Sequence, residues 1–462
     1  MSAPAYLTLA EASLLIKNRE LSPVTLTERC FKRADKLQPH LHAFVLMTRD
    51  TAMAEARKAE AEIAAGRWLG PMHGIPIGIK DIYSTRGVPT TCHSNLLKDH
   101  VPSEDAETVR RLKEAGAVIM GKLATDEFAF GTGTNLPFPV ARNPWNVDHV
   151  PSGSSSGSGV GLATGQFLGA TGSDTGGSIR SPAASNGVAG IKPTYGLVSR
   201  AGIFPLSFTA DTAGPMGWTT EDCAIQLQVM AGYDPKDPAS VDLPLPDYHQ
   251  ELGKPAKGLK VGVIRHFYEG RDGSDPETIG IFNQAYDAMR GLGVELRDVT
   301  LPDLMDFHAC GRAVILPEIY AIHRAMLEKT PELYGEITRE RARLGALVTS
   351  EEYHRGQRFR RQLIDRILKS MEGLDLLIAP SAYGAPAHVS EIEIFPYFGK
   401  PNLSMPFNLS GQPAHAICVG FGREGLPRSL QIVGRHFDEA TVLRLGHAYE
   451  KATPWRDRRP AV

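Results

Sequence analysis

The chain has 462 residues, a formal net charge of −2, 42% hydrophobic residues and 22% charged residues. This near-neutral balance argues against a large basic surface, so we expect no nucleic-acid partner. The hydrophobic content is ordinary for a globular protein, and no stretch of 18 apolar residues occurs, so we expect no membrane partner and no membrane span.

The cysteines are five in number, lie far apart and never form a C-x-x-C pair. Such isolated cysteines indicate buried thiols in a reducing compartment, and they argue against a disulfide framework or a zinc site. The first 16 residues lack the basic start and the apolar run of a signal peptide. We therefore expect a cytoplasmic protein.

Residues 1–70 are predicted to form a helical N-terminal region. Thr8 can cap a first helix, and Ser22-Pro23 opens a second, because proline suits the first helical position. An alanine-rich segment at residues 52–65 is predicted to form a third helix.

From residue 71 the pattern changes to that of a strand. Between His73 and Lys80, isoleucines alternate with small residues, which is strand periodicity. The alternation places Lys80 on the face opposite these isoleucines. A helix at residues 105–115 and a strand at residues 117–120 follow.

Residues 150–190 are packed with serine, glycine and threonine. Composition alone is also typical of a flexible linker. We reject that interpretation because a buried-looking apolar segment, residues 160–170, interrupts the run. In addition, Asp174 and Arg180 lie in a compact frame within the second part of the run, which is rare in linkers.

The rest of the chain is predicted to alternate helices and strands. Residues 233–258 are rich in proline and aspartate and are expected to form a surface connection. Residues 305–370 are expected to be helical. The remaining predicted elements are a helix at 219–230 with Asp222 in a capping box, a β-α-β unit at 259–264, 279–290 and 294–299, strands at 374–379, 414–419 and 430–433, and a final helix at 438–452.

One local pattern suggests a serine nucleophile. Ser155 is the centre of a G-x-S-x-G match, the pattern of the nucleophile elbow in α/β-hydrolases. That elbow requires an apolar strand directly before it, and residues 146–152 make a poor strand. We therefore disfavour Ser155 as the nucleophile.

Two further patterns suggest binding sites. The G-x-G-x-G run that begins at Gly157 lacks the preceding strand and the acidic partner of a dinucleotide site. His40 and His42 lack a third ligand nearby, whereas zinc takes three or four ligands from the protein. We expect neither a cofactor nor a metal.

The order of the remaining motifs resembles the amidase signature family. The resemblance covers most of the chain, and its segments are the lysine strand, both serine- and glycine-rich runs, and residues 190–196, 211–216 and 430–435. It implies an α/β fold for residues 1–462, a single large domain with a mixed central β-sheet covered by α-helices. Within this domain, it implies that residues 71–232 form the catalytic core and that residues 305–370 form a helical region on the substrate side.

The resemblance also implies a Ser–cis-Ser–Lys triad. Ser178 matches the nucleophile, Ser154 matches the bridging serine, and Lys80 matches the base. The peptide bond between Gly153 and Ser154 is expected to be cis. The residue chemistry fits this assignment independently, because a serine hydroxyl needs a base and a lysine serves as one only when burial keeps it neutral.

The second run is also expected to bind the oxyanion of a tetrahedral intermediate. As in the family, backbone N–H groups of Thr175, Gly176 and Gly177, together with that of Ser178, are its expected donors. Asp174 and Arg180, at the two ends of this loop, are expected to hold it by hydrogen bonds and an ion pair.

The sequence departs from the family pattern at several positions. Ser152 and Ser156 replace glycines beside the bridging serine. Phe130 stands where many members have methionine, and residues 132–135 lack the glutamate of the glutamine-using, tRNA-linked branch, which we therefore disfavour. Phe130 and Gly131 are the expected substrate contacts, with a plain core role for Phe130 left open.

The expected function is hydrolysis of a small aryl or alkyl amide through an acyl-enzyme, which makes the protein a hydrolase of non-peptide carbon–nitrogen bonds. Carbamate (urethane), ureide and ester hydrolysis remain open, because they pass through similar oxyanionic intermediates. A non-catalytic subunit that keeps the fold is the alternative of another class, and the presence of all three triad residues argues against it. The expected partner is a small molecule, and a homodimer is left open.

The helices within residues 305–370 are expected to form a flap over the acyl pocket. Tyr320, Tyr334 and Phe359 are candidates to line that pocket, although core packing is the preferred interpretation for each of them.

Overall fold

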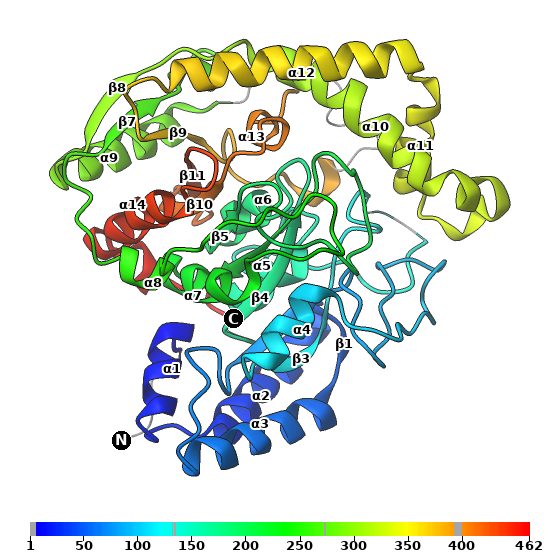
Figure 1. The fold of residues 1–462 in the computed structure, drawn as a ribbon, viewed down its shortest axis with the longest axis vertical. Coiled ribbons are helices and arrows are strands. Elements are labelled where there is room, and N and C mark those ends of the chain that lie inside the picture. The colour runs from blue at the N-terminus through cyan, green and yellow to red at the C-terminus, as the bar shows by residue number, and fades with distance from the viewer. Residues whose placement is uncertain (1–5, 132, 134, 272–273, 392–399) are drawn as a thin grey trace.

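A mixed sheet of eleven strands forms the centre of the computed structural model, which describes residues 6–131, 133, 135–271, 274–391 and 400–462 (Figure 1). The strand order is β1-β3-β2-β4-β6-β5-β10-β11-β9-β7-β8. The strands are β1 (Phe44–Met47), β2 (Pro76–Lys80), β3 (Val118–Leu123), β4 (Gly169–Asp174), β5 (Ala189–Lys192), β6 (Thr212–Gly217), β7 (Lys260–Val263), β8 (Glu295–Asp298), β9 (Leu376–Pro380), β10 (Ala414–Phe421) and β11 (Pro427–Val433).

Helices cover the sheet and extend beyond it. In the view of Figure 1, the first three helices lie at the bottom of the molecule, and the long helices of residues 304–370 lie at the top. The helices are α1 (Leu9–Lys17), α2 (Pro23–Leu41), α3 (Arg49–Ala64), α4 (Glu107–Glu114), α5 (Ser156–Ala163), α6 (Arg180–Asn186), α7 (Thr220–Met230), α8 (Tyr248–Glu251), α9 (Pro276–Gly291), α10 (Leu304–Lys329), α11 (Glu336–Arg343), α12 (Ser350–Ser370), α13 (Met405–Leu409) and α14 (Glu439–Ala452).

The predicted fold class, a single α/β domain with a large mixed sheet, is confirmed. Strand β2 is parallel to both β3 and β4, whereas β4 pairs antiparallel with β6. The predicted β-α-β unit is also present, because β7 and β8 pair in parallel and α9 lies between them in the chain. All residues of β2 and β4 are buried, so neither strand has a solvent-exposed face.

Local capping explains where several helices begin. The Thr8 side chain accepts from the Glu11 N–H at the start of α1. The Ser22 side chain accepts from the Thr25 N–H at the start of α2, whose first residue is Pro23. Thr219 and Asp222 form the predicted capping box of α7. These ends follow from short-range signals, which is why the sequence predicts them well.

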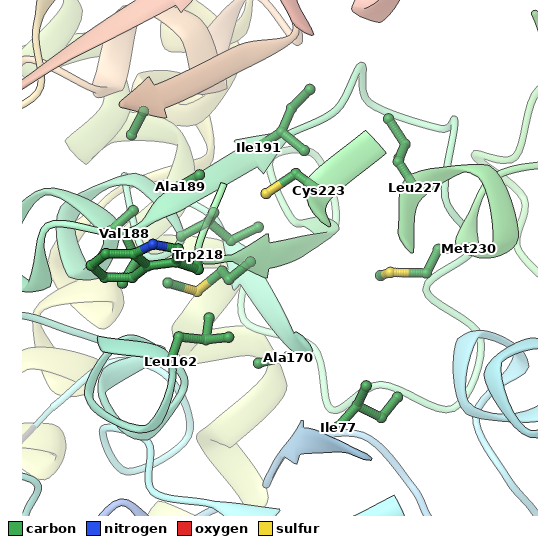
Figure 2. Close-up of a cluster of buried hydrophobic side chains, with 14 of the residues drawn as sticks. Ile77, Leu162, Ala170, Val188, Ala189, Ile191, Trp218, Cys223, Leu227 and Met230 are labelled. Carbon is green, nitrogen blue, oxygen red and sulfur yellow. The ribbon is translucent and has the colours of Figure 1, made fainter. Parts of the chain in front are cut away.

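The hydrophobic core joins the sheet to α7. Figure 2 shows Cys223 and Leu227 of α7 in one buried cluster with Ile77 of β2, Ala170 of β4 and Ile191 of β5. The five side chains are at most 1% exposed. This packing fixes the central strands, whose ends carry the polar residues described next.

No helix within the described ranges combines the length and the apolar character that crossing a membrane requires.

Candidate functional site

The parallel pairing of β2 with β4 brings two predicted site segments together. Lys80 is the last residue of β2, and β4 ends at Asp174, four residues before Ser178. Because the carboxyl ends of parallel strands meet at one edge of a sheet, the lysine and the Ser178 loop lie at the same edge. Ser154 arrives there from the segment that precedes α5.

The Lys80 side-chain nitrogen is buried among hydroxyl groups. Its Nζ lies 2.6 Å from Ser154 Oγ, 2.9 Å from Ser155 Oγ and 2.8 Å from Ser173 Oγ. The Lys80 side chain is fully buried. Hydroxyls can both donate and accept, so this surrounding is compatible with the protonated and with the neutral amine.

Burial lowers the pKa of Lys80 from 10.5 to about 7, although the negative charges of Asp126, Asp174 and Asp211 act in the opposite direction. Removal from water disfavours the charged form of an amine. The neutral form, which a general base requires, is therefore far more populated for Lys80 near pH 7 than for an exposed lysine.

Asp126 is the acidic residue with the strongest influence on that lysine. Its carboxylate packs against Gly153, where a Cβ atom would overlap both carboxylate oxygens. The Asp126 N–H donates to the Ser154 carbonyl (3.2 Å), and the Gly153–Ser154 peptide bond is cis. Burial raises the pKa of Asp126, while Lys80 acts to lower it.

The Ser178 loop curls around the Asp174 carboxylate. Asp174 accepts from the N–H groups of Gly177 (2.8 Å) and Ile179 (3.1 Å). Ser178 is half-buried, and its carbonyl accepts from the Ser155 N–H (3.2 Å). The Gly177 N–H, one of the predicted oxyanion donors, thus donates to Asp174 in this structure. Thr175 and Gly176 precede it in the same loop.

Arg180 ties this loop to the C-terminal part of the chain. It is buried, forms an ion pair with Asp174 (2.9 Å), and donates to Asn408 Oδ1 (2.6 Å) and Gln431 Oε1 (2.7 Å). Burial acts to raise the pKa of Asp174, but Arg180 and the hydrogen bonds outweigh it and hold that pKa below its usual range. Asp174 therefore stays ionised.

A cavity of about 620 Å³ opens beside these groups. Its lining includes Ser173, which also contacts Lys80, and Thr175 of the predicted oxyanion loop. One wall is apolar and comes from residues 203–206 and Phe208. The charged residues of the lining are two basic ones, Arg200 and Lys236, and two acidic ones, Asp211 and Asp237. Residues of α10, α11 and α12 do not occur among the described residues that line it, so the predicted flap does not contact this cavity.

Phe130 and Gly131 lie against α11. The Phe130 carbonyl accepts from Arg341 Nη1 (3.1 Å), and a Cβ atom at Gly131 would overlap Thr338. Their neighbour Ala129 is the residue of this segment that lines the cavity. Within the segment that lacks the glutamate, residues 132 and 134 lie outside the described residues.

The aromatic candidates of residues 305–370 also lie away from the cavity lining. Tyr334 is fully buried, and its hydroxyl lies 2.9 Å from His323 Nδ1. Tyr320 and Phe359 are partly buried and pack against the hydrophobic core. Core packing, the preferred interpretation from sequence, describes all three.

Several polar contacts around the site were not predicted from sequence. Ser155 and Ser173 contact Lys80, and Asn408 contacts Arg180. Ser155 was visible as part of a serine run, but its role as a lysine partner was not. Asn408 is 228 residues from Arg180, and no local pattern links the two. Within the described ranges, no group of three or more His, Cys, Asp or Glu side chains is arranged to hold a metal ion.

Comparison with known proteins gives one consistent result. A family model described as Amidase matches residues 25–443. A glutamyl-tRNA(Gln) amidotransferase subunit of Methylococcus capsulatus is 37% identical to the chain, with 98% of each chain covered.

Solved structures agree. The peptide amidase of Stenotrophomonas maltophilia superposes with a TM-score of 0.85 at 30% identity, covering 98% of both chains. A protein from a vestigial complex, described as revealing the origins of an s-triazine catabolic enzyme, gives a TM-score of 0.90 at 30% identity, covering 96% of this chain and 98% of that one.

The buried ion pair of Arg180 generates a stability prediction. Arg180→Met leaves the Asp174 carboxylate buried without its cation, so we expect the free energy of unfolding to fall by about 3–5 kcal/mol. Urea denaturation at pH 7 measures this change. Arg290→Met is the matched control, because Arg290 and its partner Asp287 are 51% and 74% exposed, and we expect its effect to stay below about 1 kcal/mol. Equal effects of the two substitutions would contradict the prediction.

Proposed function

The chain belongs to the amidase signature family, whose members are hydrolases acting on carbon–nitrogen bonds, and from this premise we propose that it hydrolyses a small aryl or alkyl amide through an acyl-enzyme on Ser178. In this proposal Ser154 relays the proton and Lys80 is the base. The observation that carries it is the 2.6 Å contact between Ser154 Oγ and a fully buried Lys80 Nζ.

The proposed reaction begins with neutral Lys80, which takes the Ser154 proton while Ser154 takes the proton of Ser178. The Ser178 oxygen then attacks the carbonyl carbon and forms a tetrahedral intermediate. The proton returns through Ser154 to the leaving nitrogen, so the amine departs neutral and Lys80 is neutral again. Water then attacks the acyl-enzyme by the same route in reverse and releases the acid.

The predicted oxyanion loop fits the charge that develops in this reaction. Thr175, Gly176 and the nucleophile's own N–H are the proposed donors, with Gly177 shaping the turn through its contact with Asp174. The positive φ of +118° at Gly177 suits a glycine. Thr175 is held by its own hydroxyl, which donates to Asp211 (2.6 Å).

The cavity supports the substrate class. Its apolar wall, which includes Ile203, Phe204 and Leu206, favours an aryl or alkyl group on the substrate. Carbamates, ureides and esters present the same carbonyl chemistry to the triad. They therefore remain alternatives that depend on how each group fits the cavity.

A second candidate follows from the curated relatives. Several are named as subunits of glutamyl-tRNA(Gln) amidotransferase and are 36–39% identical over nearly the whole chain. This favours a role as an amidase component that uses glutamine and works with partner subunits. The departures at residues 132–135 disfavour it, and glutamine turnover by the isolated chain, or after addition of a partner, would support it.

The triad proposal predicts that Ser178→Ala abolishes labelling by a serine-reactive phosphonate. It also predicts that Lys80→Ala lowers kcat/KM by about 10²–10⁴-fold while the protein still folds, because a general base contributes about that much. Intact-protein mass spectrometry and steady-state kinetics measure the two effects. Lys98→Ala is the control, since that side chain is 56% exposed. Equal labelling of wild type and Ser178→Ala would refute the proposal.

The substrate proposal predicts that acetanilide has a kcat/KM about 10–100-fold higher than acetamide, because the aryl group gains contact with an apolar wall. Ethyl N-phenylcarbamate, acetylurea and glutamine complete the panel. Turnover of acetylurea or glutamine alone would exclude the aryl amide as the natural class while leaving the triad intact.

The charge around Lys80 predicts a pH effect. Activity requires neutral Lys80, so kcat/KM rises with pH through a pKa of about 7. Asp126→Asn removes a negative charge that raises this pKa, so the rise moves to lower pH. At pH 6 the variant then retains a larger fraction of its own maximal activity than wild type does.

A matched control for this pH profile is Asp99→Asn, because the Asp99 side chain is 88% exposed. We expect its profile to coincide with that of wild type. A profile of Asp126→Asn that is unchanged, or shifted to higher pH, contradicts the assigned influence of Asp126.

A further inference from the structure

One wall of the cavity is a segment without regular secondary structure, residues 203–211, which we call the wall loop. It lies between β5 and β6 in the chain. The cavity-lining members of the wall loop are Ile203, Phe204, Pro205, Leu206, Phe208 and Asp211. The shape of the cavity therefore depends on what holds this loop.

Glu318 of α10 holds the middle of the wall loop. Its carboxylate accepts from Ser207 Oγ (2.5 Å), from Thr209 Oγ1 (2.8 Å) and from the Thr209 N–H (3.2 Å). The Glu318 residue is only 7% exposed, and Ser207 is fully buried. Buried, charge-assisted hydrogen bonds of this kind fix geometry strongly.

Helix α12 supports the same contact from a second side. Tyr353 donates its hydroxyl to Glu318 Oε1 (3.0 Å). Arg360 donates to Thr209 Oγ1 (2.9 Å) and to the Thr209 carbonyl (2.8 Å). Glu318 and Arg360 thus both bind Thr209, although neither of them lines the cavity.

The wall loop is connected at its other end to the predicted oxyanion loop. Asp211 accepts from the N–H groups of Leu206 (2.8 Å) and Ser207 (3.0 Å) and from Thr175 Oγ1 (2.6 Å). A continuous series of hydrogen bonds therefore runs from Glu318 through Ser207 and Asp211 to Thr175.

We propose that Glu318 is a positioning residue that sets substrate specificity: it fixes the wall loop through Ser207 and Thr209, and so determines which groups the cavity accepts beside the scissile bond. This inference rests on the proposed amidase function. It places the control of specificity in α10 and α12, helices that do not contribute to the described lining.

The chemistry of the contact explains why a carboxylate is needed. The four groups named above at Glu318 are all donors: two hydroxyls of the wall loop, one backbone N–H and the Tyr353 hydroxyl. In Glu318→Gln, an NH₂ group would replace one acceptor oxygen. It would then either face the Thr209 N–H, which can only donate, or compete at the Thr209 and Tyr353 hydroxyls, which already accept from Arg360 and Gln357. Buried donors would then lose their partner, and the loop would move to satisfy them.

The test compares Glu318→Gln with wild type on two series of anilides and amides. One series lengthens the acyl group from acetyl to octanoyl on aniline, and the other enlarges the amine of an acetamide from methylamine to naphthylamine. If wild-type kcat/KM depends on the size of the acyl group, the acyl group occupies the cavity. If it depends on the size of the amine, the amine occupies it.

For large members of that series, we expect Glu318→Gln to lower kcat/KM by about 10–100-fold, the range given by one unpaired buried donor. For the smallest member we expect a change below about threefold, and phosphonate labelling of Ser178 should be unchanged. Glu328→Gln is the control on the same helix, since the Glu328 side chain is 59% exposed. It should leave both series unaffected.

A uniform loss over both series in a folded variant, or no loss at all, overturns the proposal. If Glu318→Gln does not fold, Ser207→Ala provides the same readout, because it removes a Glu318 contact and leaves the two helices intact. Size-selective loss in Ser207→Ala supports the proposal, and its absence overturns it. A failure of the proposed function is distinguishable, because wild type would then hydrolyse no member of either amide series, and absence of phosphonate labelling would show that the triad fails as well.

Discussion

The burial of one amine at the edge of the sheet is the constraint on which the site depends. Moving a lysine away from water disfavours its charged form, so Lys80 needs either compensating partners or neutrality. The structure provides hydroxyls from Ser154, Ser155 and Ser173, which serve either state. These groups converge because β2 and β4 are parallel neighbours and end at the same edge.

The negative charges of the nearby acidic residues favour the protonated form of Lys80 and so oppose the effect of burial. Asp174 is paired with Arg180, so much of its negative charge is balanced within the loop that it organises. Asp126 has the larger effect on Lys80 and packs against the backbone of Gly153. The balance between burial and these charges leaves the pKa of the amine well below its usual value.

Much of the fold could be predicted because it follows from local signals. The caps at Thr8 and Thr219, the β-α-β unit and the lysine strand are all visible in short windows of sequence. The serine- and glycine-rich runs were recognised as structured, but α5 and β4 within them were not predicted, since small residues carry little periodicity. Their burial comes from tertiary packing rather than from propensity.

The candidate site was likewise predictable only in part. The order of its motifs could be seen in the sequence, whereas its supports could not. Asn408 and Glu318 act on segments more than 100 residues away, at 228 residues from Arg180 and 111 residues from Ser207. Sequence pattern places residues on a strand or a helix face, but it does not say which distant segment completes a hydrogen-bond network.

The network around Arg180 also has a consequence for the order of events during synthesis. The arginine leaves the ribosome long before its partners Asn408 and Gln431, which follow 228 and 251 residues later. At elongation rates of about 5–20 residues per second, this interval is roughly 10–50 seconds. During that time the nascent chain holds the Ser178 loop without its C-terminal acceptors. The hydrogen-bond network of Arg180 is thus completed only after Gln431 has been made.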